Sequence, residues 1–90
     1  MEFSAGMIVK STAGHDAGSF YVVVKAEGGY LFIADGRRRK LEAPKKKNPR
    51  HLKKTNAGLD LSQIVSDKRL RQELARFGGE TGEIFTTTGR

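Results

Sequence analysis

The stretch FYVVVKAEGGYLFIA, residues 20–34, decides the fold of this chain. Its first five residues, 20–24, are aromatic or β-branched throughout, a composition that favours a β-strand. Residues 30–34 are also apolar and rich in aromatic residues, and the Gly28-Gly29 pair between the two runs is typical of a tight hairpin turn. The stretch therefore predicts two neighbouring antiparallel strands.

The segments around this hairpin extend the β pattern in both directions. The expected elements are a short apolar run over 6–10, a hairpin turn at 35–36, a polar strand over 37–41, a basic loop over 45–48 closed by Pro49, and a brief strand over 51–54. Four or five short antiparallel strands within about fifty residues predict a mainly β fold that closes into a small barrel, because closure removes the exposed sheet edges.

The C-terminal third has a helical pattern instead. A capping pair at 66–67 precedes an expected helix over 66–77, whose apolar residues Leu70, Leu74 and Phe77 are spaced by four and three positions. We expect this apolar stripe to pack on the barrel, and a protein-binding face is the alternative.

The chain has the size of one small folded unit. We expect a barrel over residues 6–56, a C-terminal helical segment over 57–78 with a separate packed stretch at 59–65, and flexible segments at 1–5 and 79–90. Ninety residues bury only a modest core, and a chain without cysteine gains nothing from disulfides or a thiolate zinc site. We expect a monomer.

The positive charge of the chain is concentrated in one segment. There are 17 Lys and Arg against 10 Asp and Glu, a net charge of +7. Residues 1–36 have a net charge of −2, residues 37–54 of +9, and residues 55–90 of zero. A surface that is basic only for solubility would interleave its signs, so residues 37–54, the basic block, indicate a polyanionic partner. Its basic residues are Arg37, Arg38, Arg39, Lys40, Lys45, Lys46, Lys47, Arg50, Lys53 and Lys54, opposed by Glu42 alone.

The basic block supplies most of the candidate contacts to that partner. If residues 37–41 form a strand, Arg37 and Arg39 share one face while Arg38 and Lys40 share the other, so one pair needs acidic partners or the strand is a solvated edge. A basic edge that deters aggregation is the alternative interpretation. Lysines suit non-specific phosphate contacts, whereas arginines can also fork onto phosphate or stack on bases. Further candidates are Lys10, His15 and His51.

The aromatic residues of the central hairpin allow two interpretations. Phe20 and Phe32 are expected in the core of the barrel. Tyr21 and Tyr30 are either core residues or a platform on which bases stack.

The segment GMIVKSTAGHDAGSFYVVV, residues 6–24, resembles the KOW motif, in which a loop with glycines four apart joins two hydrophobic strands. Residues 7–9 fit the first strand, Gly14 and Gly18 the glycine pair, and residues 21–24 the second strand. With the hairpin and the basic block that follow, the chain resembles stand-alone bacterial KOW proteins, which are similar to KOW-containing large-subunit ribosomal proteins of archaea and eukaryotes.

The resemblance implies an SH3-like β-barrel that binds RNA, commonly rRNA in a ribosomal or translation setting. The residues alone leave RNA and DNA open as alternatives. Gly14 and Gly18 serve the backbone geometry of the loop or let its backbone approach a phosphate. The family usually has Lys or Arg just before the second glycine, where this chain has Ala17, so we expect no basic contact there.

The sequence gives little support to catalysis. It contains neither a phosphate-binding loop of the GxxxxGK[ST] type nor a strand-linked GxGxxG, and its two histidines lack metal-ligand spacing. We therefore expect no enzyme activity, no metal, no cofactor and no small-molecule substrate.

Two other binding functions stay open beside RNA binding. An SH3-like protein-interaction module within a translation or nucleic-acid assembly is the first alternative. A binder of anionic membrane surfaces is the second, although the chain lacks the amphipathic face of interfacial helices. No apolar run is long enough to span a bilayer and no secretion signal is visible, so we expect a cytoplasmic protein without a membrane partner.

Overall fold

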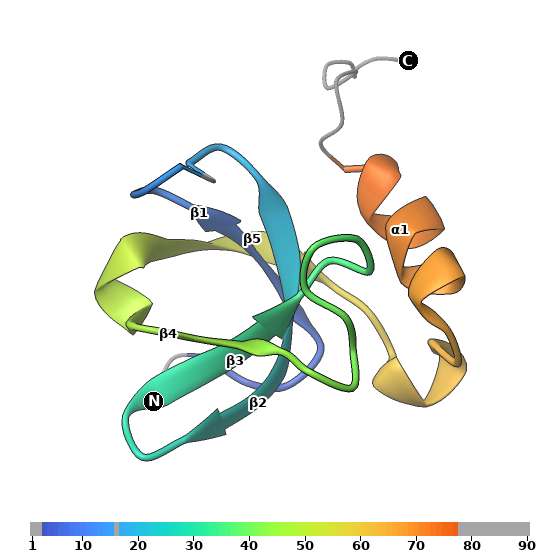
Figure 1. Ribbon diagram of the computed structural model, residues 1–90, viewed down its shortest axis with the longest axis horizontal. Helices are drawn as coiled ribbons and strands as arrows, with labels where there is room; N and C mark the ends of the chain where they lie inside the picture. Colours follow the sequence, from blue (N-terminus) through green and yellow to red (C-terminus); the bar gives the residue numbers. More distant parts are fainter. Residues whose placement is uncertain (1–2, 16, 78–90) are drawn as a thin grey trace.

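The computed structural model describes residues 3–15 and 17–77, which form an antiparallel sheet with one helix beside it (Figure 1). The sheet order is β4-β3-β2-β1-β5. Its strands are β1 (Met7–Ser11), β2 (Phe20–Glu27), β3 (Tyr30–Ala34), β4 (Lys45–Lys47) and β5 (Leu52–Gly58). Two single 3-10 turns, η1 (Pro49–His51) and η2 (Leu61–Gln63), precede β5 and the helix α1 (Asp67–Ala75). The mainly β fold with a C-terminal helix is confirmed.

The β2–β3 hairpin forms as residues 20–34 predict. Gly28 and Gly29 have φ angles of +63° and +84°, the left-handed conformation that a two-residue type I′ turn requires at both central positions. The turn brings Glu27 opposite Tyr30, and the ladder continues to the pair Val22 and Ala34. Glycine supplies this backbone conformation without a Cβ clash, so the sequence signal has a direct structural cause.

Two irregularities curve the sheet. The β2–β3 register shifts between Val23 and Lys25, and the β1–β5 register shifts between Met7 and Val9. Such bulges bend the strand that carries them and increase its twist. The edge strands β4 and β5 are joined through η1 by residues 48–51 alone (Figure 1).

Each face of the sheet carries its own hydrophobic cluster. The cluster between sheet and helix joins Ile8, Val22 and Ala34 from the strands to Ile64, Leu70 and Leu74 from the C-terminal segment. The cluster on the opposite face consists of Val9, Tyr21, Val23, Leu31, Ile33 and Leu52. Strand residues alternate between these clusters with a period of two, as expected for a sheet that is covered on both faces.

The helix α1 begins as the capping signal predicts. The hydroxyl of Ser66 accepts a hydrogen bond from the backbone N–H of Arg69 at 3.2 Å, and Leu70 and Leu74 are buried against the sheet. Phe77 was expected in the same apolar stripe, but it lies beyond the end of the helix and is 36% exposed. The apolar stripe therefore ends one turn earlier than the spacing indicates.

The predicted packed stretch over 59–65 is partly confirmed. Ile64 is buried and Leu59 and Leu61 are half-buried against the helix-side cluster, whereas Val65 is 84% exposed. Asp60 caps η2, because its carboxylate accepts hydrogen bonds from the Ser62 hydroxyl at 2.6 Å and from the Ser62 backbone N–H at 3.0 Å. These bonds, chiefly that of the hydroxyl, hold the pKa of the Asp60 carboxyl below its ordinary value.

Two predictions within the basic block are wrong. Residues 37–41 form a loop rather than a polar strand, and Asp35-Gly36 begins this loop instead of a tight hairpin. Residues 45–47 form the strand β4 rather than a basic loop. The last predicted strand, over 51–54, exists but is longer, since β5 runs over Leu52–Gly58. The predicted flexible tail over 79–90 lies outside the described residues.

Candidate nucleic-acid interface

Residues 35–41, here called the arginine loop, are closed by their own hydrogen bonds. The Oδ1 of Asp35 accepts from the backbone N–H groups of Arg37 at 2.8 Å and Arg39 at 3.0 Å. The N–H groups of Asp35 and Gly36 in turn donate to the carbonyl oxygen of Arg39. These local bonds give the backbone an alternative to a sheet ladder, which explains why the segment does not form a strand. The side chains of Arg37, Arg38, Arg39 and Lys40 are exposed.

The arginine loop is docked on α1. The Leu41 N–H donates to the Asp67 Oδ1 at 2.8 Å, and the Arg71 Nη1 donates to the Gly36 carbonyl oxygen at 2.7 Å. Gly36 is buried with a φ of +81°, and a Cβ at this position would lie 2.5 Å from the Asp67 carbonyl oxygen. The helix therefore fixes the base of the loop, while the arginine side chains extend into solvent.

The strand β4, here called the lysine strand, pairs with β3 at the edge of the sheet. Lys45, Lys46 and Lys47 lie opposite Ile33, Phe32 and Leu31 respectively. Lys45 and Lys47 are half-buried on the face of Ile33 and Leu31, where the aliphatic parts of the side chains can cover the core while the ammonium groups reach water. Lys46 is exposed on the helix-side face.

A third basic group lies where η1 meets the β1–β2 loop. The Thr12 N–H donates to the His51 carbonyl oxygen at 2.9 Å, which ties the loop that carries His15 to η1. Lys10 lies opposite Lys53 across β1 and β5. This η1 group consists of Lys10, His15, Arg50, His51, Lys53 and Lys54, all exposed, with Lys54 opposite Val9 and therefore on the other face of the sheet from Lys10 and Lys53.

The glycine pair of the β1–β2 loop serves backbone geometry. Gly14 and Gly18 have φ angles of +85° and +93°. A Cβ at Gly18 would meet no atom within 4 Å, so the conformation rather than the available space calls for glycine there. The N–H of Gly18 donates to the Ser11 carbonyl oxygen at 2.8 Å and closes the loop, so this N–H is already used within the protein.

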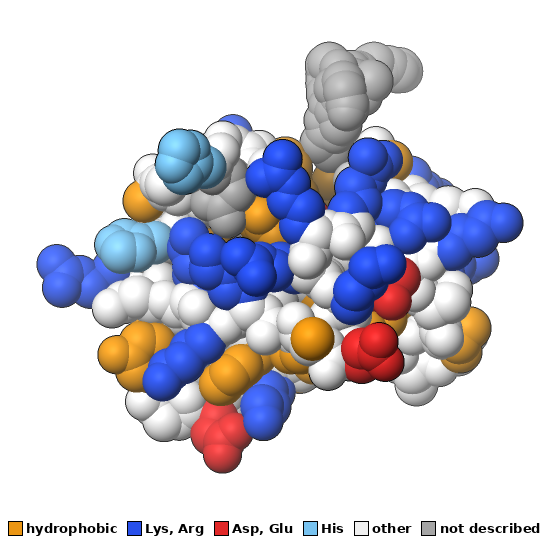
Figure 2. Space-filling model, viewed as in Figure 1, with side chains coloured by type: hydrophobic (Ala, Val, Ile, Leu, Met, Phe, Trp, Pro, Cys, Tyr) orange, Lys and Arg blue, Asp and Glu red, His pale blue; other side chains and the backbone are white. Residues whose placement is uncertain are grey.

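The structure thus divides the candidate residues into the arginine loop beside α1, the η1 group beside the β1–β2 loop, and the lysine strand at the sheet edge. Figure 2 shows Lys and Arg side chains spread over one face of the molecule from the η1 side to α1, with few Asp and Glu among them. Among the described residues, no carboxylate forms an ion pair with Arg37, Arg38 or Arg39. The loop arginines are therefore available to an external anion.

Of the two tyrosines considered as stacking residues, Tyr30 is accessible and Tyr21 is not. Tyr21 is only 2% exposed and belongs to the core cluster opposite the helix, so its interpretation as a stacking platform is wrong. Tyr30 is 39% exposed at the β2–β3 hairpin. The expectation of Phe20 and Phe32 as core residues holds only in part, because both are half-buried.

Sequence reasoning missed the basic side chains of α1. Lys68 is exposed, and Arg71 holds the arginine loop. Arg69 and Arg76 form ion pairs with Glu73 at 3.2 Å and 3.1 Å. The polar positions of the amphipathic pattern could have indicated a basic helix face, but its contact with residue 36 is not visible in the sequence.

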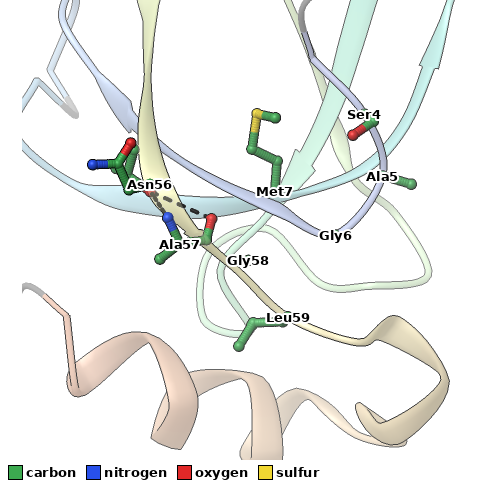
Figure 3. Close-up of a pocket in the computed structure, with 9 residues that line it drawn as sticks. Ser4, Ala5, Gly6, Met7, Asn56, Ala57, Gly58 and Leu59 are labelled. Atoms are coloured by element: carbon green, nitrogen blue, oxygen red, sulfur yellow. Dashed lines mark hydrogen bonds between the residues drawn. The ribbon is translucent and has the colours of Figure 1, made fainter.

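An open pocket of about 320 Å³ lies where the chain before β1 meets the end of β5 (Figure 3). The Thr55 hydroxyl accepts from the Ala57 N–H at 3.1 Å and donates to the Ile8 carbonyl oxygen at 2.7 Å, so it supports the bulged strand pair. The lining residues are Ser4, Ala5, Gly6, Met7, Thr55, Asn56, Ala57, Gly58 and Leu59. None of these side chains titrates, so the pocket supplies no group for acid–base chemistry.

No protein-family model matches the chain, and a search of curated proteins returns no match. Within residues 3–15 and 17–77, no helix has the length and apolar character needed to cross a membrane. The same part of the chain contains no group of three or more His, Cys, Asp or Glu side chains placed to hold a metal ion.

Proposed function

We propose that this protein is a KOW-type RNA-binding module with an SH3-like barrel, which associates with ribosomes or rRNA and contacts the RNA chiefly through phosphates. Support for the barrel comes from the order β4-β3-β2-β1-β5 and from the short connection through η1 between the two edge strands. The positive φ angles of Gly14 and Gly18 fit the glycine positions of the KOW motif.

The observation that carries the proposal is the presentation of the basic block. Its ten Lys and Arg side chains are exposed or half-buried, and they extend from a docked loop, an edge strand and the η1–β5 segment. Like charges gathered on a small surface repel one another, and the phosphates of RNA offset this repulsion. RNA rather than DNA follows from the resemblance to KOW proteins.

The three groups contribute differently to RNA binding. Lys46 and the other lysines act as point charges on the phosphate backbone, where each contact releases condensed counterions. Arg37, Arg38 and Arg39 can form forked hydrogen bonds with phosphate or stack on bases, so the arginine loop adds preference for RNA shape. The helix holds this loop in place through Asp67 and Arg71.

A protein-interaction module is the second candidate function. Val65 and Phe77 are exposed apolar side chains, one before α1 and one after it. Such residues can anchor a protein partner. Under this function the basic block would be a solvated surface, and its removal would leave partner binding unchanged.

The test of RNA binding compares two variants that lose the same charge. Replacing Lys45, Lys46 and Lys47 together by Ala should weaken binding to many RNAs and flatten the slope of log K against log salt by about two to three units, at ~0.7–0.9 per phosphate. The matched control replaces Lys68, Arg69 and Arg76 on α1 by Ala and should change the slope by less. Equal effects of the two variants would show that only net charge matters, and unchanged affinity of the first would favour the protein-interaction function.

Ribosome association has its own test. The tagged protein should sediment with ribosomes at low salt and dissociate at high salt, because screening and counterion release both weaken phosphate contacts. The variant without the three lysines of β4 should dissociate at lower salt than the α1 control. A protein that never sediments with ribosomes but binds structured RNA would retain the RNA-binding proposal and remove its ribosomal part.

A further inference from the structure

Lysine and aromatic side chains alternate across the helix-side face of β2, β3 and β4. Phe32 lies opposite Lys25 on one side and opposite Lys46 on the other, and Tyr30 precedes Phe32 by two residues on the same face. The Lys25 Nζ lies 4.8 Å from the centroid of the Phe32 ring, and the Lys46 Nζ lies 4.4 Å from the centroid of the Tyr30 ring. These four residues are here called the hairpin strip.

The hairpin strip is not required by either hydrophobic core. Tyr30 and Phe32 belong to neither buried cluster, and α1 packs near Val22 and Ala34, at the other end of the β2–β3 pair. Figure 1 shows the hairpin projecting away from α1. A single exposed aromatic side chain is ordinary on a protein surface, but two adjacent rings with two ammonium groups over them form a polar and stacking surface that packing does not explain.

We infer that the hairpin strip binds an unpaired nucleotide of RNA, with the base stacked on Tyr30 and the adjoining phosphate on Lys46; the inference rests on the proposed RNA-binding function. In the free protein the Lys46 ammonium group covers one face of the Tyr30 ring. A base gains more from stacking on an aromatic ring than an exposed ammonium group does, so the base takes that face. The long Lys46 side chain then turns its charge to the phosphate.

The two lysines of the strip have different roles because of Glu27. The Lys25 Nζ forms an ion pair with the Glu27 Oε1 at 3.0 Å, so its charge is already balanced. The β2–β3 register also places Glu27 directly opposite Tyr30, so a carboxylate lies beside the stacking position and opposes a phosphate there. Lys46 is therefore the phosphate contact of the strip, and Glu27 weakens the site.

The test measures binding of two RNAs, an oligouridine single strand and a blunt-ended duplex. Tyr30→Leu keeps an apolar side chain but removes the ring, and it should weaken oligouridine binding about 5- to 100-fold while leaving duplex affinity and the salt slope unchanged. Lys46→Ala should instead flatten the salt slope for oligouridine by about 0.7 units. Glu27→Gln should strengthen oligouridine binding. Tyr30→Phe is the matched control and should bind both RNAs like the unaltered protein.

Tyrosine fluorescence gives a second readout that a merely structural role would not change. The chain has no Trp and two Tyr, and Tyr21 is only 2% exposed. Stacking of a base on Tyr30 should therefore quench the emission of the unaltered protein, and Tyr30→Phe should abolish this quenching while it retains affinity. Unaltered protein that binds both RNAs, with Tyr30→Leu indistinguishable from it, would overturn this inference alone. Unaltered protein that binds neither RNA would overturn the proposed function as well.

Discussion

The arginine loop and the lysine strand belong to one basic block, yet different interactions hold them. The arginine loop depends on side chains, because Asp35 closes it and Asp67 and Arg71 attach it to α1. The lysine strand depends on backbone pairing with β3 at the sheet edge. A change at the helix should therefore alter the position of the arginines and leave the lysines in place.

The two regions also differ in how they present charge. All four basic side chains of the arginine loop are exposed, so they can meet an anion from several directions. The lysine strand alternates, with Lys46 on the helix-side face and Lys45 and Lys47 on the other. An RNA strand along one face of the sheet edge meets only part of the lysine triplet, so the full loss of about two to three slope units requires RNA backbone along both faces of this edge. Under the proposed function, the loop would recognise RNA shape and the strand would hold RNA backbone on either face.

The largest expected effect comes from a Cβ at Gly36. Gly36→Ala forces a left-handed backbone onto alanine and places its Cβ 2.5 Å from the Asp67 carbonyl oxygen, so loop and helix must separate. We expect a loss of about 2–4 kcal/mol in the free energy of unfolding, measured by urea denaturation. RNA preference should change with it, because the arginines lose their fixed base.

Gly28→Ala is the matched control for this substitution. Gly28 has a φ of +63°, but a Cβ there would meet no atom within 4 Å. Alanine at this position is then disfavoured only by its backbone conformation. We expect the free energy of unfolding to fall by about 1 kcal/mol. If both substitutions lowered the free energy of unfolding equally, the close contact between the loop and the helix at Gly36 would make no measurable contribution to stability.

The next substitutions test whether the arginine loop recognises the shape of RNA or only attracts RNA by its charge. Replacing Arg37 and Arg39 by Ala should flatten the salt slope by about 1.4–1.8 units and change the order of affinity among structured RNAs. Replacing both by Lys keeps the charge and should restore the slope without restoring the order. Competition binding with a hairpin, a bulged stem and a duplex measures both. Full restoration by lysine would show that the loop acts through charge alone.

The smallest effect lies outside both regions, at Asp60. Hydrogen bonds from Ser62 lower the pKa of the folded Asp60 carboxyl, so its contribution to stability is present at neutral pH and is lost as the pH falls below about 4. The Asn side chain of Asp60→Asn cannot titrate. The difference in the free energy of unfolding between this variant and the unaltered protein should therefore become smaller as the pH is lowered. Urea denaturation at a series of pH values measures this difference. A difference that grows toward low pH would contradict the cause given for the pKa.

Local sequence signals were sufficient where the structure itself is local. The Gly28-Gly29 turn and the Ser66 cap act within a few residues, and both formed as predicted. The reversal of strand and loop within the basic block has one local cause, the Asp35 hydrogen bonds that close the arginine loop, and two non-local causes. Asp67 binds the N–H of Leu41, 26 residues earlier, and the lysine strand exists because β3 offers an edge to pair with. Strand formation by charged residues depends on such context more than on propensity.

The candidate site likewise has features that the sequence shows and features that only the folded chain reveals. The concentration of charge in residues 37–54 was visible in the sequence, because composition requires no fold. The contact of Lys46 with Tyr30 was not visible, since it depends on a cross-strand register that no local pattern specifies. The role of Arg71 in holding the arginine loop was hidden for the same reason.

The salt dependence of RNA affinity tests the central claim most directly. The claim is that the basic block binds RNA through its phosphates, and anisotropy titrations of one structured RNA at several salt concentrations measure it. With about five to seven phosphate contacts, the slope of log K against log salt should be roughly −3.5 to −6. A slope near zero, or tight binding that persists at high salt, would contradict the claim and leave the basic block as a solvated surface.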